Sequence, residues 1–347
     1  MKAGKLPAEL LSSLLERLPT DPGLLIGPGV GLDAAAIDLG DGRALVVTTD
    51  PITFATDQIG RYAVHVNAND VACLGARPAW FVATVLLPEG SAPELAELIF
   101  DQIRATCDEL AISPAGGHTE VTAGLDRPII VGTMFGEVAT EALVRPERAR
   151  SGDHVVLTKG IAVEGTALIA REAPATLHAR GVSDATIAGA ALLLEQPGIS
   201  IVRDAQIALA SADVHALHDP TEGGLSTALL ELSQSTRHEL RVRSEDITVL
   251  EETSAICSAL GLDAIGLLAS GALLIVVGAA ECDHLRAALA SESIHSTCIG
   301  ELAAVGSVAI IDQNGHALPR FERDEVARFF ETLGERESAG GATRTTQ

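Results

Sequence analysis

Several residue types that would identify a common class of protein are scarce in this sequence. Aromatic residues make up 3% of its 347 residues, so stacking platforms for single-stranded nucleic acid are not expected. Lys and Arg number 24 against 47 Asp and Glu, and this net charge of -23 disfavours nucleic acid or an anionic membrane as a partner. No uninterrupted apolar run reaches the roughly 18 residues of a membrane-spanning helix. We therefore predict no nucleic-acid partner, no membrane partner and a cytoplasmic location.

Cysteine is also sparse, and its spacing excludes two further classes. The five cysteines are scattered along the chain and never form a CxxC pair: Cys73, Cys107, Cys257, Cys282 and Cys298. This pattern argues against a zinc site and against a disulfide framework. Each cysteine is expected to be a small buried hydrophobic residue.

The sequence does contain 47% hydrophobic residues, arranged in glycine-bounded runs that alternate with stretches of helical periodicity. This pattern predicts a mixed α/β (α+β) fold with two domains. Strands are expected at 43–52, 79–88 and 128–138, helices at 58–76 and 92–112, and a closing strand pair near 271–278 and 308–312. The charged stretch 145–153 separates domains at 1–145 and 150–330, and the small, polar tail 335–347 is expected to be disordered.

A glycine-rich loop, GPGVGLDAAAIDLG at 27–40, leads to the first candidate site residue, Asp33. Gly29 and Gly31 match neither GxGxxG nor the P-loop pattern, so neither of those mechanisms applies. Alternating glycines do let backbone amides approach a polyphosphate. A flexible lead into a strand is equally compatible with them.

Four aspartates stand out by their context. Asp33 follows the glycine loop, Asp50 precedes a proline at a strand end, Asp70 interrupts an apolar helical face, and Asp219 lies in LHDPTEGG. A carboxylate in such a place needs a partner that offsets its desolvation, and convergence on Mg2+ would supply one. Taken singly, Asp33, Asp50 and Asp219 could instead be turn or cap residues.

Three other polar segments are candidates for binding phosphate. AGGHTEV at 115–121 carries His118, Thr119 and Glu120, although a lone His in a turn is more often structural. Lys159 follows a strand, where its charge could meet a phosphate or remain solvated. Gly223 and Gly224 open a helix, whose free amides favour an anion.

Taken in order, six segments resemble the aminoimidazole ribonucleotide (AIR) synthetase, or PurM-like, superfamily of ATP-using enzymes, closest to the HypE-type hydrogenase maturation factors. They are GVGLDAAAIDL, VVTTDPI, DQIGRYAVHVNANDVACLGARP, GGHTEV, HDPTEGGL and ASGALLIVV, within about residues 5–330. The resemblance implies two α/β domains, and a homodimer in which the N-terminal sheets of two subunits pair into a barrel. It also implies ATP and Mg2+ as cofactors.

The resemblance assigns roles residue by residue. It implies Asp33, Asp50, Asp70 and Asp219 as Mg2+ ligands, and catalytic candidates Asp50, Asp70 and Lys159. Expected nucleotide contacts are Gly29, Gly31, Asp33, Thr49, Asn69, Gly117, His118, Thr119, Glu120, Gly223 and Gly224. Relatives often carry Asp at the position of His118.

The implied activity is ATP-dependent phosphorylation of an amide or carbonyl oxygen on an unidentified small substrate, in hydrogenase maturation and with a maturation partner. HypE-type factors use a cysteine at the end of a short tail, whereas this sequence ends in GATRTTQ and its last cysteine is Cys298. Carbamoyl dehydration by that route is therefore not expected. The alternative is a non-catalytic nucleotide-binding maturation or regulatory partner.

Overall fold

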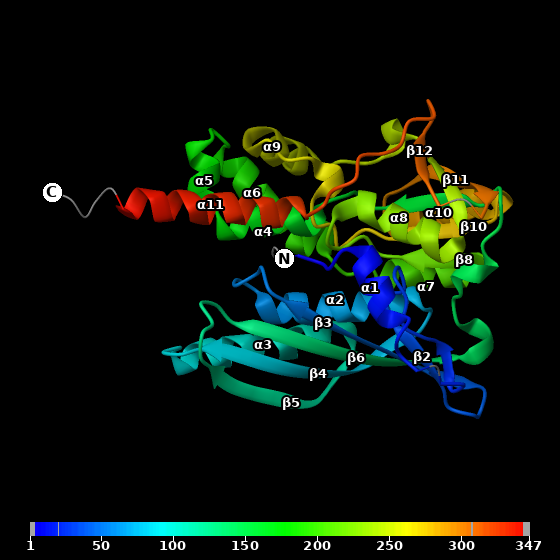
Figure 1. The fold of residues 1–347 in the computed structure, drawn as a ribbon, viewed down its shortest axis with the longest axis horizontal. Helices are drawn as coiled ribbons and strands as arrows, with labels where there is room; N and C mark the ends of the chain where they lie inside the picture. The colour runs from blue at the N-terminus through cyan, green and yellow to red at the C-terminus, as the bar shows by residue number, and fades with distance from the viewer. Residues whose placement is uncertain (1–3, 20, 307, 343–347) are drawn as a thin grey trace.

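The computed structural model describes residues 4–19, 21–306 and 308–342, and it contains two six-stranded sheets with helices packed against them (Figure 1). This is the predicted mixed α/β class. The first half of the chain forms the lower sheet in the view, and the second half forms the upper one.

In the first half, the sheet has the strand order β1-β2-β3-β6-β4-β5. Its strands are β1 Leu24–Ile26, β2 Ala35–Asp38, β3 Arg43–Ile52, β4 Arg77–Pro88, β5 Ser113–Thr122 and β6 Ile129–Ala139, and its helices are α1 Ala8–Leu15, α2 Ile59–Cys73 and α3 Pro93–Leu110. Neighbouring strands are antiparallel except β4 and β5, which are parallel because α3 forms the crossover between them. Helices α2 and α3 pack on one face of this sheet (Figure 1).

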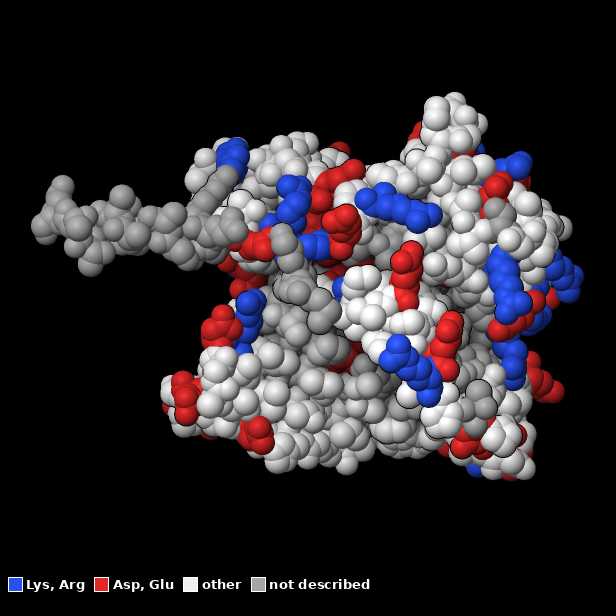
Figure 2. All heavy atoms as spheres, in the orientation of Figure 1, with Lys and Arg blue, Asp and Glu red and all other residues white. Residues whose placement is uncertain are grey.

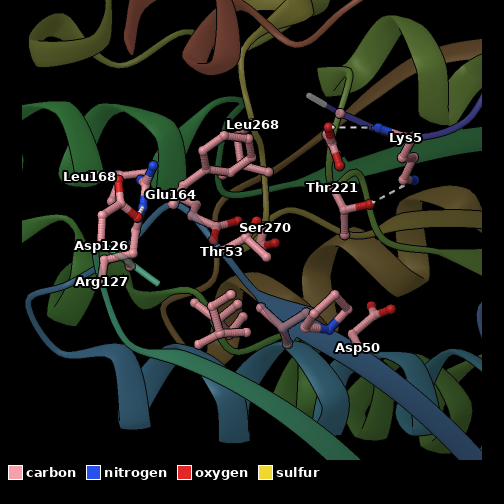
Figure 3. A pocket seen from close by; sticks show the side chains of 18 residues that line it. Lys5, Asp50, Thr53, Asp126, Arg127, Glu164, Leu168, Thr221, Leu268 and Ser270 are labelled. Atoms are coloured by element: carbon pink, nitrogen blue, oxygen red, sulfur yellow. Dashed lines mark hydrogen bonds and ion pairs between the residues drawn. The ribbon is translucent and has the colours of Figure 1, made fainter. Parts of the chain in front are cut away.

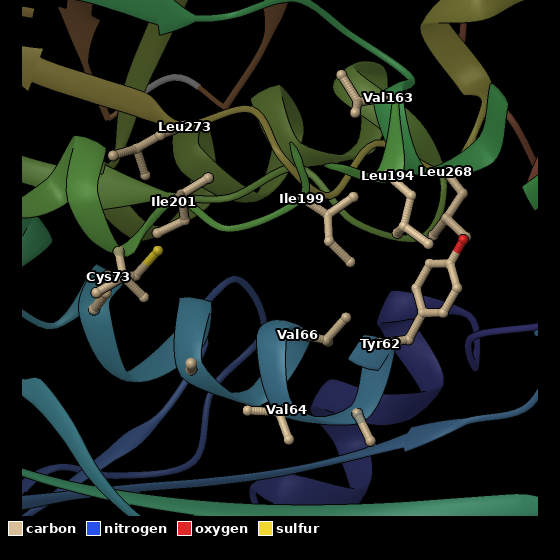
Figure 4. Packing of buried hydrophobic residues seen from close by; sticks show 14 of the residues in the cluster. Tyr62, Val64, Val66, Cys73, Val163, Leu194, Ile199, Ile201, Leu268 and Leu273 are labelled. Carbon is tan, nitrogen blue, oxygen red and sulfur yellow. The ribbon is translucent and has the colours of Figure 1, made fainter. Parts of the chain in front are cut away.

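Helix α2 lies between the first sheet and the second half of the chain, and 14 of its 15 residues are buried. Its polar residues were expected to interrupt a single apolar face, but the helix is enclosed on all sides. Figure 4 shows Tyr62 and Val66 on α2 turned toward Leu268 and Ile199 of the second half, and Cys73 turned toward Ile201. This packing joins the two halves around one apolar core.

In the second half, the sheet has the order β12-β9-β11-β7-β10-β8, antiparallel except for the β12–β9 pair. Its strands are β7 His154–Thr158, β8 Val214–His218, β9 His238–Val242, β10 Leu274–Val277, β11 Ser296–Val305 and β12 Ile310–Asp312, and its helices are α4 Val163–Glu172, α5 Pro174–Ala179, α6 Asp184–Leu192, α7 Val202–Ser211, α8 Gly224–Thr236, α9 Glu251–Leu260, α10 Cys282–Ser291 and α11 Glu325–Ala342. Alternate residues of the central strands face α8 on one side and α7 and α10 on the other.

Two segments differ from what the sequence suggested, and a third meets the length and composition criteria of a membrane span. Residues 113–122 form strand β5, where a polar loop was expected at AGGHTEV. The tail expected to be disordered from 335 is helical to Ala342, and 343–347 lie outside the described residues. The stretch Asp184–Ser211 has the length and apolarity of a membrane span, but it folds as α6, a kinked segment and α7. Of its 18-residue apolar window, 44% is buried, so the stretch is weak evidence for a membrane span.

Candidate functional site

The four aspartates singled out in the sequence meet where the two halves of the chain join. Asp33 comes from the loop before β2, Asp50 from β3, Asp70 from α2, and Asp219 directly follows β8. The hydroxyl of Thr48 lies 2.8 Å from Asp70 Oδ2 and 3.0 Å from the backbone oxygen of Asp33. Asp50 lies close enough to Asp70 for its charge to raise the pKa of the Asp70 carboxyl. Three carboxylates of the first half are thereby held next to one of the second.

Cys73 completes the buried edge of this cluster. Its thiol donates to Asp219 Oδ1 at 3.5 Å, and donor atoms of Asp33, Cys73 and Asp219 all lie within 4.8 Å of one another. Asp219 Oδ2 is buried and has no hydrogen-bond partner among the described residues. A buried carboxylate oxygen without a partner is costly, so the site favours a ligand that satisfies it.

Two basic groups face the carboxylates, and both lie outside the set predicted from the sequence. His218 contacts Asp33 through Nδ1 at 2.8 Å and Glu231 through Nε2 at 3.1 Å. Lys5 Nζ lies 3.6 Å from Glu231 and donates to Thr221 at 3.3 Å. Burial alone would lower the pKa of His218, but contact with Asp33 and Glu231 raises it well above its usual value.

Burial and mutual repulsion disfavour ionisation of the aspartates. Burial raises the pKa of Asp50 and raises that of Asp70 well above its usual range, where Asp50 and Asp219 add to the effect. Burial and the charge of Asp33 raise the pKa of Asp219 to about 7. A divalent cation would offset this repulsion, because carboxylate oxygens are the ligands that Mg2+ prefers.

A cavity of about 640 Å³ opens beside Asp50 between the two halves. Figure 3 shows Lys5, Thr221 and Asp50 at one end of it, and Glu164 and Arg127 toward the other. Its size falls within the range of about 300–1,000 Å³ usual for small-molecule sites. The cavity can therefore hold a ligand against Asp50, the member of the aspartate cluster that lines it.

Glu164, at the start of α4, is a residue of this cavity that the sequence analysis missed. Burial raises its pKa to about 7, against a smaller opposing effect of Ser270 beside it, and its Oε2 has no hydrogen-bond partner among the described residues. A lone carboxylate inside the apolar run GIAVEGTALIA was the available signal. Its side chain can exchange a proton near neutral pH.

The glycine loop fits tightly against the second half of the chain. Gly31 has a φ of +76°, and a Cβ there would lie 2.7 Å from the backbone oxygen of Glu231 on α8. A Cβ at Gly29 would meet Leu32 of the same loop at 2.7 Å. Gly31 thus permits the close approach that brings Asp33 to His218.

Two expected nucleotide contacts of the first half are directed elsewhere. Asn69 donates to the backbone oxygen of Ile199 at 2.8 Å and accepts from the amide of Ile201 at 2.9 Å, tying α2 to the second half. Thr49 donates to the carbonyl of Gly132 on β6 at 2.8 Å. Since side chains alternate along a strand, Thr49 faces the side of the sheet opposite Asp50.

Lys159 and the start of α8 are also engaged within the chain. Lys159 Nζ lies 3.1 Å from Asp204 in an ion pair whose side chains are 7% and 2% exposed. The amide of Gly223 donates to Asp324 Oδ2 at 2.6 Å, so a carboxylate of the chain already occupies this helix start. Gly224 has a φ of +65° and lies close to the backbone of Ile265. Lys159 and the amide of Gly223 thus already have partners within the chain.

Residues Gly117, His118, Thr119 and Glu120 lie on the exposed edge strand β5. Strand pairing connects Gly117 to Asp50 in three steps. Gly117 pairs with Ala83 on β4, Ala83 pairs with Gly132 on β6, and Gly132 pairs with Asp50 on β3. Three strand spacings of about 4.8 Å therefore separate β5 from Asp50, roughly 14 Å at the same height in the sheet. His118 contacts Glu120 at 3.1 Å and lines a second cavity of about 520 Å³ next to α3. Within one chain, this segment is apart from the aspartates.

Known proteins share both the sequence and the fold. Residues 31–138 match the family described as AIR synthase related protein, N-terminal domain, and 150–313 match its C-terminal domain. The carbamoyl dehydratase HypE of Rhizobium leguminosarum bv. viciae is 30% identical over 82% of this chain and 78% of its own.

Two solved structures are also similar to this chain. A crystal structure of the hydrogenase maturation protein HypE in complex with ATP has a TM-score of 0.68 at 25% identity, covering 94% of this chain and 98% of that one. A HypE–HypF complex has a TM-score of 0.67 at 21% identity, over 84% and 94%, a level that shows the fold alone.

Proposed function

Because this chain belongs to the AIR synthase related family, we propose that it binds Mg-ATP at the four aspartates and phosphorylates an amide or carbonyl oxygen of a small substrate. The convergence of Asp33, Asp50, Asp70 and Asp219, with Asp50 lining the cavity, carries this proposal. A relative at 30% identity is named a carbamoyl dehydratase, which makes a carbamoyl amide the first substrate class to test.

In the proposed reaction, the amide oxygen attacks the γ-phosphorus, an O–P bond forms, and ADP leaves. The aspartates would hold Mg2+, which neutralises the phosphates. Lys5, at the same end of the cavity, contributes a further positive charge. Glu164, which lines the same cavity, can accept the proton that the amide nitrogen loses as its oxygen is phosphorylated. The remaining task is to position the two substrates.

Calorimetry with Mg-ATP tests the binding step. Wild-type protein is expected to bind Mg-ATP and to lose affinity at least tenfold in excess chelator, because a chain of charge -23 repels free ATP. Asp70→Asn, which preserves shape, should weaken binding by about tenfold or more, equivalent to about 1.4 kcal/mol. Asp108→Asn on the exposed side of α3 is the matched control. Normal binding by Asp70→Asn would show that the metal assignment is wrong.

The pH dependence of binding provides a second check. Asp219 has a raised pKa of about 7 and must lose its proton to ligate a cation. Affinity for Mg-ATP is therefore expected to increase from pH 6 to pH 8. An affinity that falls over this range would contradict a role for Asp219 as a ligand.

One observation favours a second candidate function, a nucleotide-binding maturation or regulatory partner that does not turn ATP over. Lys159 is held in a buried ion pair with Asp204, and Asp324 occupies the start of α8. Two groups that could have bound phosphate are thus already engaged. ADP release measured with small amides separates the functions: substrate-dependent release that Asp50→Ala abolishes supports the enzyme, and tight binding without release supports the partner.

We also propose a homodimer formed through the uncovered face of the first sheet. By strand alternation, Val47, Val82, Val131 and Phe135 lie on the face opposite α2 and α3. Trp80, on the same face, is 40% exposed. Figure 2 shows few charged side chains on this side of the first half. Such an apolar sheet face is typical of an interface.

A second copy is also how the exposed residues of β5 could reach a nucleotide. Light scattering should give twice the chain mass, and Trp80→Glu should give monomers. A wild-type monomer at micromolar concentration would contradict the proposal. By analogy with the HypE–HypF complex, a hydrogenase maturation protein is the partner to test in pull-down experiments.

A further inference from the structure

A cluster of two thiols and an imidazole lies outside the aspartate site. His154 begins β7, Cys298 lies in β11, and Cys282 begins α10. One donor atom from each lies within 4.8 Å of the other two. The wide spacing of the cysteines in the sequence gave no sign of this arrangement, which arises because β7 and β11 are neighbours and α10 packs against both.

The cluster is separate from the aspartates. On β10, Val277 pairs with His154 and Leu274 pairs with His218. His154 and His218 are therefore at opposite ends of β10, and Asp219 directly follows His218. A ligand bound at the thiols would leave the nucleotide cavity unobstructed.

The donor set fits a soft or borderline cation. Zn2+ is bound by thiolate and imidazole, and its bonds of about 2.0–2.3 Å place ligand atoms roughly 3.5–3.8 Å apart in a tetrahedron. The donor atoms of His154, Cys282 and Cys298 already lie within 4.8 Å of one another, so small side-chain movements are enough to reach that geometry. His154 Nδ1 is buried and has no hydrogen-bond partner among the described residues. An imidazole nitrogen in that state is available to a ligand.

The charges around the thiols are compatible with cation binding. A hydrogen bond from Cys282 lowers the pKa of Cys298 to about 5, and Arg243 contributes to the shift. The same pairing raises the pKa of Cys282. Arg243 is itself paired with Asp246 at 2.6 Å, which offsets its charge. The cation beside the thiols therefore has its own carboxylate partner, and it does not oppose a divalent cation at the cluster with an unpaired charge.

We propose that His154, Cys282 and Cys298 form a binding site for a thiophilic divalent cation of the Zn2+ class, with water as the fourth ligand. Binding forms two metal–sulfur bonds and one metal–nitrogen bond, and the protons held by the thiols pass to solvent. The ion ties α10 to β7 and β11. No electron transfer is involved.

Cobalt titration of the reduced, metal-free full-length protein tests this site. One equivalent of Co2+ should give a thiolate-to-metal charge-transfer band in the near ultraviolet and tetrahedral d–d bands, and Zn2+ should displace both. Cys298→Ser should weaken Co2+ binding at least tenfold. Cys257→Ser, which removes another buried cysteine, should leave it unchanged. Asp70→Asn should also retain the band, so the outcome is independent of the proposed nucleotide site.

Three results would overturn the proposal. The first is a folded, reduced wild-type protein without a thiolate band at one equivalent of Co2+. The second is unchanged affinity in Cys298→Ser or, should that variant fail to fold, in His154→Asn. The third is a pair that forms a disulfide in air, seen as a mass loss of two daltons, yet takes up no metal after reduction.

Discussion

Replacing Glu164 with Gln should remove a pH-dependent loss of stability. Burial raises the pKa of this carboxyl from 4.5 to about 7. In the unfolded chain Glu164 ionises at lower pH than in the folded chain, so ionisation opposes folding as pH rises between these two values. A full pKa unit corresponds to about 1.36 kcal/mol. The part of this shift that titrates between pH 5 and pH 8 lowers the free energy of unfolding by about 2.5 kcal/mol. Glutamine has nearly the same shape and does not ionise.

Urea unfolding of both proteins, without nucleotide or Mg2+, measures this effect. The free energy of unfolding of Glu164→Gln minus that of wild type should become more positive by about 2.5 kcal/mol from pH 5 to pH 8. Glu97→Gln, an exposed replacement on α3, controls for the loss of one carboxylate. A difference that stays constant with pH would refute the reasoning, because it would mean that Glu164 is as easily ionised in the folded chain as in the unfolded one.

Two further predictions concern the contacts that position the site. Gly224→Ala places a Cβ 2.5 Å from the backbone oxygen of Ile265. It should destabilise the fold by about 1 kcal/mol or more beyond the control Gly261→Ala, because Gly261 has a similar positive φ but open space around it. Equal unfolding midpoints of the two variants would contradict this. Asn69→Ala leaves two buried backbone groups of the second half unpaired, at about 1–3 kcal/mol each. Its free energy of unfolding should therefore fall by about 2–6 kcal/mol. A loss below about 1 kcal/mol in urea would contradict the tie between the halves.

The convergence of the aspartates could be anticipated because each stands in an unusual local context. Strand alternation would also have separated Thr49 from Thr48 and Asp50, since successive side chains point to opposite faces. The role of Asn69 was not accessible in this way. Its partners at 199 and 201 are set by the docking of the two halves, which depends on packing that no local pattern encodes.

The basic residues and the thiol cluster were missed for a related reason. Lys5 and His218 acquire meaning only from the carboxylates that tertiary structure places beside them. Cys282 and Cys298 lack the short spacing by which metal sites are recognised in a sequence. Strand β5 was missed because its glycines and polar residues are typical of a loop, while its strand pairing comes from β4.

The division of the aspartates between the two halves also determines when the site can exist during synthesis. Asp219 emerges from the ribosome roughly 150 residues after Asp70, which at about 5–20 residues per second is a delay on the order of ten seconds. Until Ile199 and Leu268 have also been synthesised, the α2 side chains that pack on them lack these partners. The nascent first half thus exposes an apolar helix surface that a chaperone could recognise. Nucleotide binding would then be a property of the finished chain alone.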